Sequence, residues 1–228
     1  MSFIVIEGLD GAGKSTQVEM IANYIKNQNK EVEYIHFPSM NSKVFGEMIA
    51  RFLRGEFGGI KDVNPYLVAL LFAGDRFNLS GKINEWLNLG KTVINDRYVY
   101  SNIGFQCAKL TEEQEQNKLA EWIFDMEYNY FKIPKPDLSI FLDVPFEFTK
   151  QRLAENRKGK DRDYLNGNTD IHETDLDFQK KVRKTYLNAI EKDKDFIKIE
   201  CFDNNNKILK PEIISSNIIK ELKKRYLI

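Results

Sequence analysis

The feature that most constrains this chain is its first apolar segment and the turn that follows it. Residues 3–7 predict a strand, a helix is expected to open at Lys14, and a glycine-rich turn lies between them. Four positions match the spacing G-x-x-x-x-G-K-[ST]: Gly8, Gly13, Lys14 and Ser15. A strand, this turn and a helix in succession predict a phosphate-binding loop, or P-loop.

The residue types of this loop have physical reasons. Glycines let successive backbone N–H groups face phosphate oxygens, and the helix N-terminus adds partial positive charge. Lys14 is expected to reach the β- and γ-phosphates of a nucleotide, and the Ser15 hydroxyl to face Mg²⁺. The alternative, a chance glycine-rich turn, does not account for the flanking strand and helix. The predicted nucleotide-binding positions are Gly8, Leu9, Asp10, Gly11, Ala12, Gly13, Lys14, Ser15 and Thr16.

Composition narrows the remaining function classes. Lys plus Arg and Asp plus Glu number 34 each, so net charge favours neither a nucleic-acid partner nor a polybasic membrane anchor. The early apolar run is too short for a signal peptide, and nothing approaches the roughly 20 apolar residues of a membrane span. Cys107 and Cys201 lack metal-ligand spacing and are expected to be reduced. These features predict a cytoplasmic protein.

Apolar runs at residues 3–7, 32–37, 92–95, 138–144 and 196–202 alternate with helical patterns. This alternation predicts an α/β fold, a P-loop NTPase three-layer sandwich whose five-stranded parallel sheet is flanked by helices. We expect one domain over residues 1–228. Asn64 and Pro65 predict one helix start, and residues 111–114 predict another through a capping box. Ligands should bind at the carboxyl ends of the strands.

Three further segments are expected at that edge. Asp96 and Arg97 follow the third strand. A carboxylate at this position can bind Mg²⁺ or orient an attacking oxygen, and an arginine can bind phosphate through two hydrogen bonds. The alternative is that the two residues form a surface ion pair. Residues 155–170 form a charged loop whose Arg157 and Arg162 could close over transferring phosphate; a solvated loop is the alternative. Phe72 and Arg76 share a helical face suited to a nucleobase, although Phe72 also fits a core position.

Taken together, these segments resemble the thymidylate kinase (dTMP kinase) family of P-loop nucleoside monophosphate kinases. The resemblance runs nearly end to end and rests on residues 3–17, 37–38, 71–76, 96–101 with 105–106, and 142–144. It implies ATP-dependent phosphorylation of dTMP to dTDP with Mg²⁺. Family members are commonly homodimers, so a homodimer is expected here.

The resemblance also implies roles for individual residues. On the donor side, Lys14 and the loop amides would hold ATP, and Ser15 and Asp96 would serve the metal. On the acceptor side, Asp10 would bind the 3′-hydroxyl. Asp96 and Arg97 would bind and orient the metal, water and the acceptor phosphate. The remaining acceptor positions are Phe37, Phe72 stacking on thymine, Arg76 donating to its O4, Ser101 and Asn102 near the base, and Phe105 beside the sugar, disfavouring a 2′-hydroxyl.

Two features show how this chain compares with other members of the family. Lys14 is the single basic residue of the P-loop, so Arg157 or Arg162 would supply lid charge, as in the bacterial-type arrangement. Residues 37–42 lack the Arg that the family commonly carries after Phe-Pro, and Lys43, Arg51 or Arg97 could replace it.

Two rival functions stay open at this level. A kinase of the same fold could act on another deoxynucleotide or on a deoxynucleoside. A non-catalytic nucleotide-binding switch would bind GTP and need an Asn-Lys-x-Asp motif, which the sequence lacks.

Overall fold

The computed structural model describes residues 1–40, 42–155 and 160–228, with backbone alone at 160–162. The described residues form a five-stranded, all-parallel sheet in the order β2-β3-β1-β4-β5. The strands confirm the five predicted segments: β1 (Ser2–Gly8), β2 (Val32–His36), β3 (Thr92–Asp96), β4 (Leu138–Asp143) and β5 (Phe196–Glu200).

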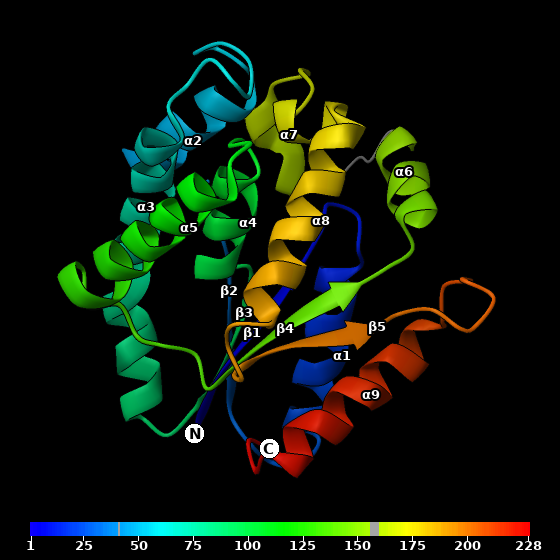
Figure 1. Cartoon of the computed structure of the whole chain (residues 1–228). Helices are drawn as coiled ribbons and strands as arrows, with labels where there is room; N and C mark the ends of the chain where they lie inside the picture. Colours follow the sequence, from blue (N-terminus) through cyan, green and yellow to red (C-terminus); the bar gives the residue numbers. More distant parts are fainter. Residues whose placement is uncertain (41, 156–159) are drawn as a thin grey trace.

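Helices cover both faces of this sheet (Figure 1). α1 (Lys14–Lys26) and α9 (Pro211–Lys224) lie on one face, where Ile4 and Ile6 of β1 pack in a shared apolar cluster. α3 (Pro65–Asn88), α4 (Val99–Cys107), α5 (Glu113–Phe124) and α8 (Leu176–Ile190) lie on the other, where Phe3 and Val5 are buried. Successive side chains of a strand point to opposite faces, so one apolar run supplies both layers.

The shorter elements gather around the carboxyl ends of the strands and the outer rim. They are α2 (Phe45–Leu53), the π-helical turn η1 (Asp125–Tyr130), α6 (Phe146–Ala154), the 3-10 turn η2 (Lys160–Leu165) and α7 (Ile171–Thr174). The segment expected to be an irregular charged loop therefore contains η2.

Strand register decides which chain ends meet. Ile6 of β1 stands opposite Asp96 of β3, and Asp96 also stands opposite His36 of β2. Because these strands are parallel, their carboxyl ends share one edge of the sheet. The P-loop, which follows β1, therefore lies beside Asp96.

The helix starts were predicted with mixed success. Asn64 caps α3 by accepting a hydrogen bond from the Tyr66 N–H at 2.9 Å, with Pro65 in the first turn, which confirms that prediction. The capping box predicted at residues 111–114 was wrong: Glu112 occupies the N-cap of α5, and no side chain caps that helix.

α4 was not predicted at all. Its nine residues are all buried between the sheet and neighbouring helices. A helix buried on every side has no polar face, so its sequence lacks the 3.6-residue alternation that marks amphipathic helices.

Every helix in the described part of the chain is too short or too polar to cross a bilayer. A cytoplasmic location stays a prediction.

Candidate active site

A cavity of about 540 Å³ opens at the carboxyl ends of the strands. It is lined from the P-loop, the ends of β2 and β3, α3, α4 and the segment around α7. Twelve of the predicted site residues line it: Asp10, Gly11, Lys14, Ser15, Phe37, Phe72, Arg76, Asp96, Arg97, Ser101, Asn102 and Phe105. Residues from six separate segments of the chain thus meet around one space.

The other predicted positions have different outcomes. Gly8, Leu9, Ala12, Gly13 and Thr16 belong to the P-loop and the start of α1 without lining the cavity. Arg157 lies outside the described residues, and only the backbone of Arg162 is described. The lid arginines therefore stay predictions.

The P-loop has the backbone that its glycines permit. Gly11 and Gly13 have φ angles of 76° and 82°, in the left-handed region that favours glycine, and Gly13 caps α1. Lys14 is 7% exposed, and its Nζ donates to the Leu9 carbonyl at 3.0 Å. Burial and the nearby Arg97 charge lower the pKa of Lys14 to about 8. An anion bound in the loop would favour the charged form of Lys14 and so raise this pKa again.

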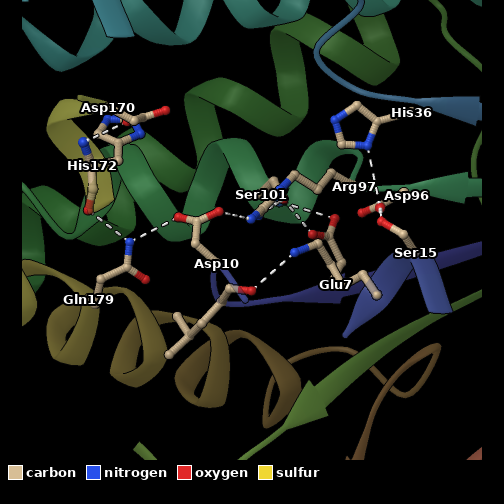
Figure 2. Close-up of polar contacts among 12 residues, drawn as sticks. Glu7, Asp10, Ser15, His36, Asp96, Arg97, Ser101, Asp170, His172 and Gln179 are labelled. Atoms are coloured by element: carbon tan, nitrogen blue, oxygen red, sulfur yellow. Dashed lines mark hydrogen bonds and ion pairs between the residues drawn. The ribbon is translucent and has the colours of Figure 1, made fainter. Parts of the chain in front are cut away.

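Asp96 and Ser15 form the polar centre between the P-loop and β3 (Figure 2). Asp96 Oδ2 accepts from the Ser15 hydroxyl at 3.2 Å and lies 3.4 Å from Nδ1 of His36. Although burial opposes its ionisation, Lys14 and His36 hold the pKa of Asp96 below its ordinary value. Its Oδ1 is buried and has no hydrogen-bond partner among the described residues, which leaves an acceptor available for a ligand.

Arg97 connects β3 to the P-loop on the other side of the cavity. Its Nη2 donates to Asp10 Oδ1 at 2.6 Å and its Nη1 to the Ser101 hydroxyl at 3.0 Å. Asp10 Oδ2 in turn accepts from the Gln179 amide of α8 at 3.0 Å (Figure 2). The guanidinium is nearly buried, and its carbon lies 5.1 Å from the Phe105 ring centroid. The arrangement brings a cation and a carboxylate together at the cavity wall.

The cavity is also lined by Phe72 and Arg76, the pair predicted for a nucleobase. Arg76 is buried and forms a bidentate ion pair with Glu127, at 2.5 Å from Nε and 2.7 Å from Nη2. The Asn102 amide also donates to Glu127, at 3.0 Å. Phe72 is half-buried, lines the cavity and packs on an apolar cluster with α2; its role at a nucleobase stays a prediction. Glu127 had no signal in the sequence, since it lies 51 residues from Arg76.

The structure narrows the choice of residue that could replace the arginine missing after Phe37-Pro38. Arg51 pairs with Glu56 at 2.8 Å and lies over the Phe57 ring. Neither Arg51 nor Lys43 is among the described residues that line the cavity, whereas Arg97 is. Of the three candidates, Arg97 alone is among the described residues that line the cavity, and its role at an acceptor phosphate stays a prediction.

The segment after η2 contributes residues that sequence reasoning missed. Asp170 accepts from the Tyr164 hydroxyl and the His172 N–H, both at 2.8 Å, and burial together with Asp10 and Glu173 raises its pKa to about 7. His172 is buried with its ring centroid 4.9 Å from that of Phe105, and burial lowers its pKa to about 3. The sequence here showed only a polar stretch without periodicity.

Glu7 was also missed. It is fully buried at the end of β1 and hydrogen bonds to α4 and α8 beneath Arg97. A charged residue inside an otherwise apolar strand was the signal that could have found it, because buried charges need specific partners.

The fold and the site first define a class. A parallel sheet of this order, with a P-loop after β1 and an aspartate–arginine pair beside it, defines a P-loop nucleotide kinase. Comparison with known proteins then identifies the family. The thymidylate kinase family model matches residues 6–213, and the chain belongs to this family.

Similar proteins support that assignment. A probable thymidylate kinase of Thermococcus kodakarensis is 35% identical over 194 residues, covering 83% of this chain and 84% of the relative. The thymidylate kinase of Plasmodium falciparum is 31% identical over 222 residues, covering 97% and 90% respectively. A solved thymidylate kinase structure from Candida albicans matches with a TM-score of 0.73 at 23% identity, covering 99% of this chain and 92% of that one, and supports the fold.

Proposed function

We propose that the cavity at the strand ends is where this chain carries out the reaction of its family, the phosphorylation of dTMP to dTDP with ATP as donor. The observation that carries the proposal is the meeting of donor-side and acceptor-side groups around one space. Lys14 and Asp96, which are assigned to the donor side, line the same cavity as Phe72 and Arg76, which are assigned to the acceptor side.

On the donor side, the loop amides and Lys14 hold the β- and γ-phosphates of ATP. Ser15 and Asp96 would hold Mg²⁺, and their oxygens fit it: Mg²⁺ prefers oxygen ligands, and Asp96 Oδ1 is a buried acceptor without a partner. No cluster of three or more His, Cys, Asp or Glu side chains suited to a metal occurs among the described residues. This agrees with a Mg²⁺ that keeps waters and phosphate oxygens as its other ligands. When bound, Mg²⁺ supplies positive charge to the phosphates.

On the acceptor side, Arg97 faces the dTMP phosphate and Asp10 the 3′-hydroxyl. Phe72 stacks on thymine and Arg76 donates to its O4 through the nitrogen that Glu127 leaves free. The other acceptor contacts come from Phe37, Ser101, Asn102 and Phe105, the last beside the sugar where a 2′-hydroxyl would clash.

The attacking group needs little activation. The phosphate oxygen of dTMP is already anionic, so in-line transfer requires alignment and charge neutralisation rather than a strong general base. Lys14 and Arg97 supply two of those charges within the described cavity, and Arg157 or Arg162 of the lid would supply more.

We also propose that the chain is a single kinase domain that forms a homodimer through α3. The apolar residues Ile49 and Phe52 of α2 are buried in the core and offer no surface to a second copy. On α3, Leu67, Leu70 and Phe77 are 60%, 42% and 48% exposed. A second copy covering them would remove apolar surface from water. Sedimentation velocity tests this: a Leu70→Glu variant should shift the chain to monomer, and a wild-type monomer would refute it.

An acceptor panel tests the proposed function. ADP release is measured with ATP, Mg²⁺ and each of dTMP, dUMP, dCMP, dGMP, thymidine and deoxyguanosine. The highest kcat/KM is expected for dTMP. A higher value for a nucleoside would show that the acceptor end binds no phosphate, and no turnover with any acceptor would favour a binding module.

A further inference from the structure

Glu7 is a carboxylate that the reaction does not use directly, yet four hydrogen bonds hold it in place. Its Oε1 accepts from the backbone N–H groups of Tyr98 at 2.8 Å and Ser101 at 3.1 Å. Its Oε2 accepts from the hydroxyls of Ser101 at 2.5 Å and Tyr186 at 3.0 Å. Burial raises the pKa of Glu7, while these four donors and the Arg97 charge favour its ionised form. With every lone pair engaged, Glu7 is unsuited to act as a general base.

The first consequence concerns the start of α4. Tyr98 is its N-cap residue, and no side chain of the helix end itself provides a cap. Ser101 lies in the first turn, where N–H groups have no partner within the helix. Glu7 accepts from both, and its negative charge lies at the positive end of the helix. β1 therefore caps α4 from outside the helix.

The second consequence concerns the Arg97 backbone. Arg97 has a φ of 68°, a left-handed conformation that is unfavourable for a residue with a side chain. Its own N–H donates to the Ile6 carbonyl at 2.9 Å, and the next N–H, that of Tyr98, donates to Glu7. Two consecutive residues of β1 thus hold the backbone on either side of the Arg97 Cα and set the direction of its side chain.

The third consequence concerns the Ser101 hydroxyl. An ionised carboxylate only accepts hydrogen bonds, so the Ser101 O–H must donate to Glu7. Its oxygen can then accept from Arg97 Nη1 at 3.0 Å, while Nη2 donates to Asp10 (Figure 2). The same oxygen also lies 2.9 Å from the Tyr186 hydroxyl, whose proton can serve either Ser101 or Glu7. The guanidinium is held at both nitrogens, and one of those contacts depends on the charge of Glu7.

We propose that Glu7 is a positioning residue for the acceptor: it holds Arg97 in place through the α4 cap and the Ser101 hydroxyl. This inference rests on the proposed role of Arg97 at the dTMP phosphate. It assigns to a buried strand residue an effect on acceptor binding without any contact to the acceptor.

The substitution Glu7→Gln tests this with little change in shape. The amide oxygen must take the Oε1 position to accept from the two backbone N–H groups, which keeps the α4 cap. The amide NH₂ then lies at the Oε2 position and donates toward Ser101, in competition with Arg97. We expect kcat/KM for dTMP to fall by about 10- to 100-fold and the dTMP Kd from calorimetry to rise, because small misplacements of a clamp are costly. The KM for ATP should change by less than about threefold.

A double-mutant cycle separates positioning from general destabilisation. In an Arg97→Ala background, Glu7→Gln should cost less than about threefold in dTMP affinity, because its target is gone. Ser101→Ala keeps the charge and the backbone cap and covers a Glu7→Gln chain that fails to fold. Because Ser101 is also a proposed acceptor contact, its dTMP defect is measured in the same cycle, and the part that acts through Arg97 should be absent in the Arg97→Ala background. Tyr98→Phe, which loses only the distant hydrogen bond to the Pro134 carbonyl, is the matched control and should bind dTMP like wild type.

The outcomes are distinct. Equal losses from Glu7→Gln with and without Arg97, or equal effects on ATP and dTMP, would overturn the role of Glu7 and leave the proposed function standing. Wild-type dTMP affinity in Arg97→Ala would remove the proposed role of Arg97 itself, and this inference with it.

Discussion

Removing Glu127 should destabilise the protein more than removing the whole Arg76–Glu127 pair. Arg76 is 1% exposed and Glu127 is fully buried, and two hydrogen bonds of 2.5 and 2.7 Å join them. In Glu127→Ala the guanidinium stays buried without its counter-charge, at a cost of about 3–5 kcal/mol. For a chain of this length, about 2 °C of Tm corresponds to each kcal/mol, so Tm should fall by about 6–10 °C.

Thermal and urea denaturation followed by circular dichroism measure this loss. The double variant Arg76→Met/Glu127→Leu removes both charges and should lie within about 2 kcal/mol of wild type, since apolar replacements of buried pairs are often near neutral. It should still lose dTMP affinity, because the contact proposed between Arg76 and the base is removed. If Glu127→Ala lost less than about 1 kcal/mol, or if the double variant were as unstable as the single one, the buried-charge reasoning would be refuted.

Three further outcomes follow from other parts of the site. Lys14→Ala should lower kcat by at least about 100-fold in the ADP-release assay, since it removes a charge aimed at the transferring phosphates, and wild-type-like kcat would contradict the phosphate role. Gly46→Ala should cost about 1–3 kcal/mol in urea denaturation and raise the KM for dTMP, because the new Cβ would lie 2.5 Å from the Ser39 carbonyl oxygen beside the cavity. Gly81→Ala, with nothing within 4 Å, is its matched control and should stabilise α3 by about 0.5–1 kcal/mol. Burial raises the pKa of Asp170 to about 7, so its contribution favours the folded state at low pH and is lost as pH rises from about 4 through 7. Asp170→Asn should flatten that part of the stability profile, between about pH 4 and pH 7, and an unchanged slope would show that Asp170 does not titrate there.

Much of the fold could be predicted because its signals are local. Each strand is an apolar run, and a strand is long enough to show its pattern within a few residues. α4 escaped because all of its residues are buried, which removes the alternation that marks a helix. Propensity and patterning describe surface-facing elements best, and α4 is not one of them.

The site likewise has a part with a local sequence signal and a part without one. The P-loop is contiguous, so its spacing alone specified a nucleotide phosphate site, and the segment from Asp96 to Ser101 specified the family resemblance. The partners that hold these residues come from far along the chain. Glu127 meets Arg76 across 51 positions, and Gln179 meets Asp10 across 169.

By itself, then, the sequence determined the phosphate-binding chemistry, the parallel sheet and the family. The tertiary structure alone decided that Arg97 rather than Lys43 or Arg51 faces the cavity, and that Asp170 and His172 border it. It also decided that Glu7 lies beneath Arg97. The physical reason is that backbone conformation and residue spacing are local properties, whereas the pairing of buried charges depends on which elements pack together.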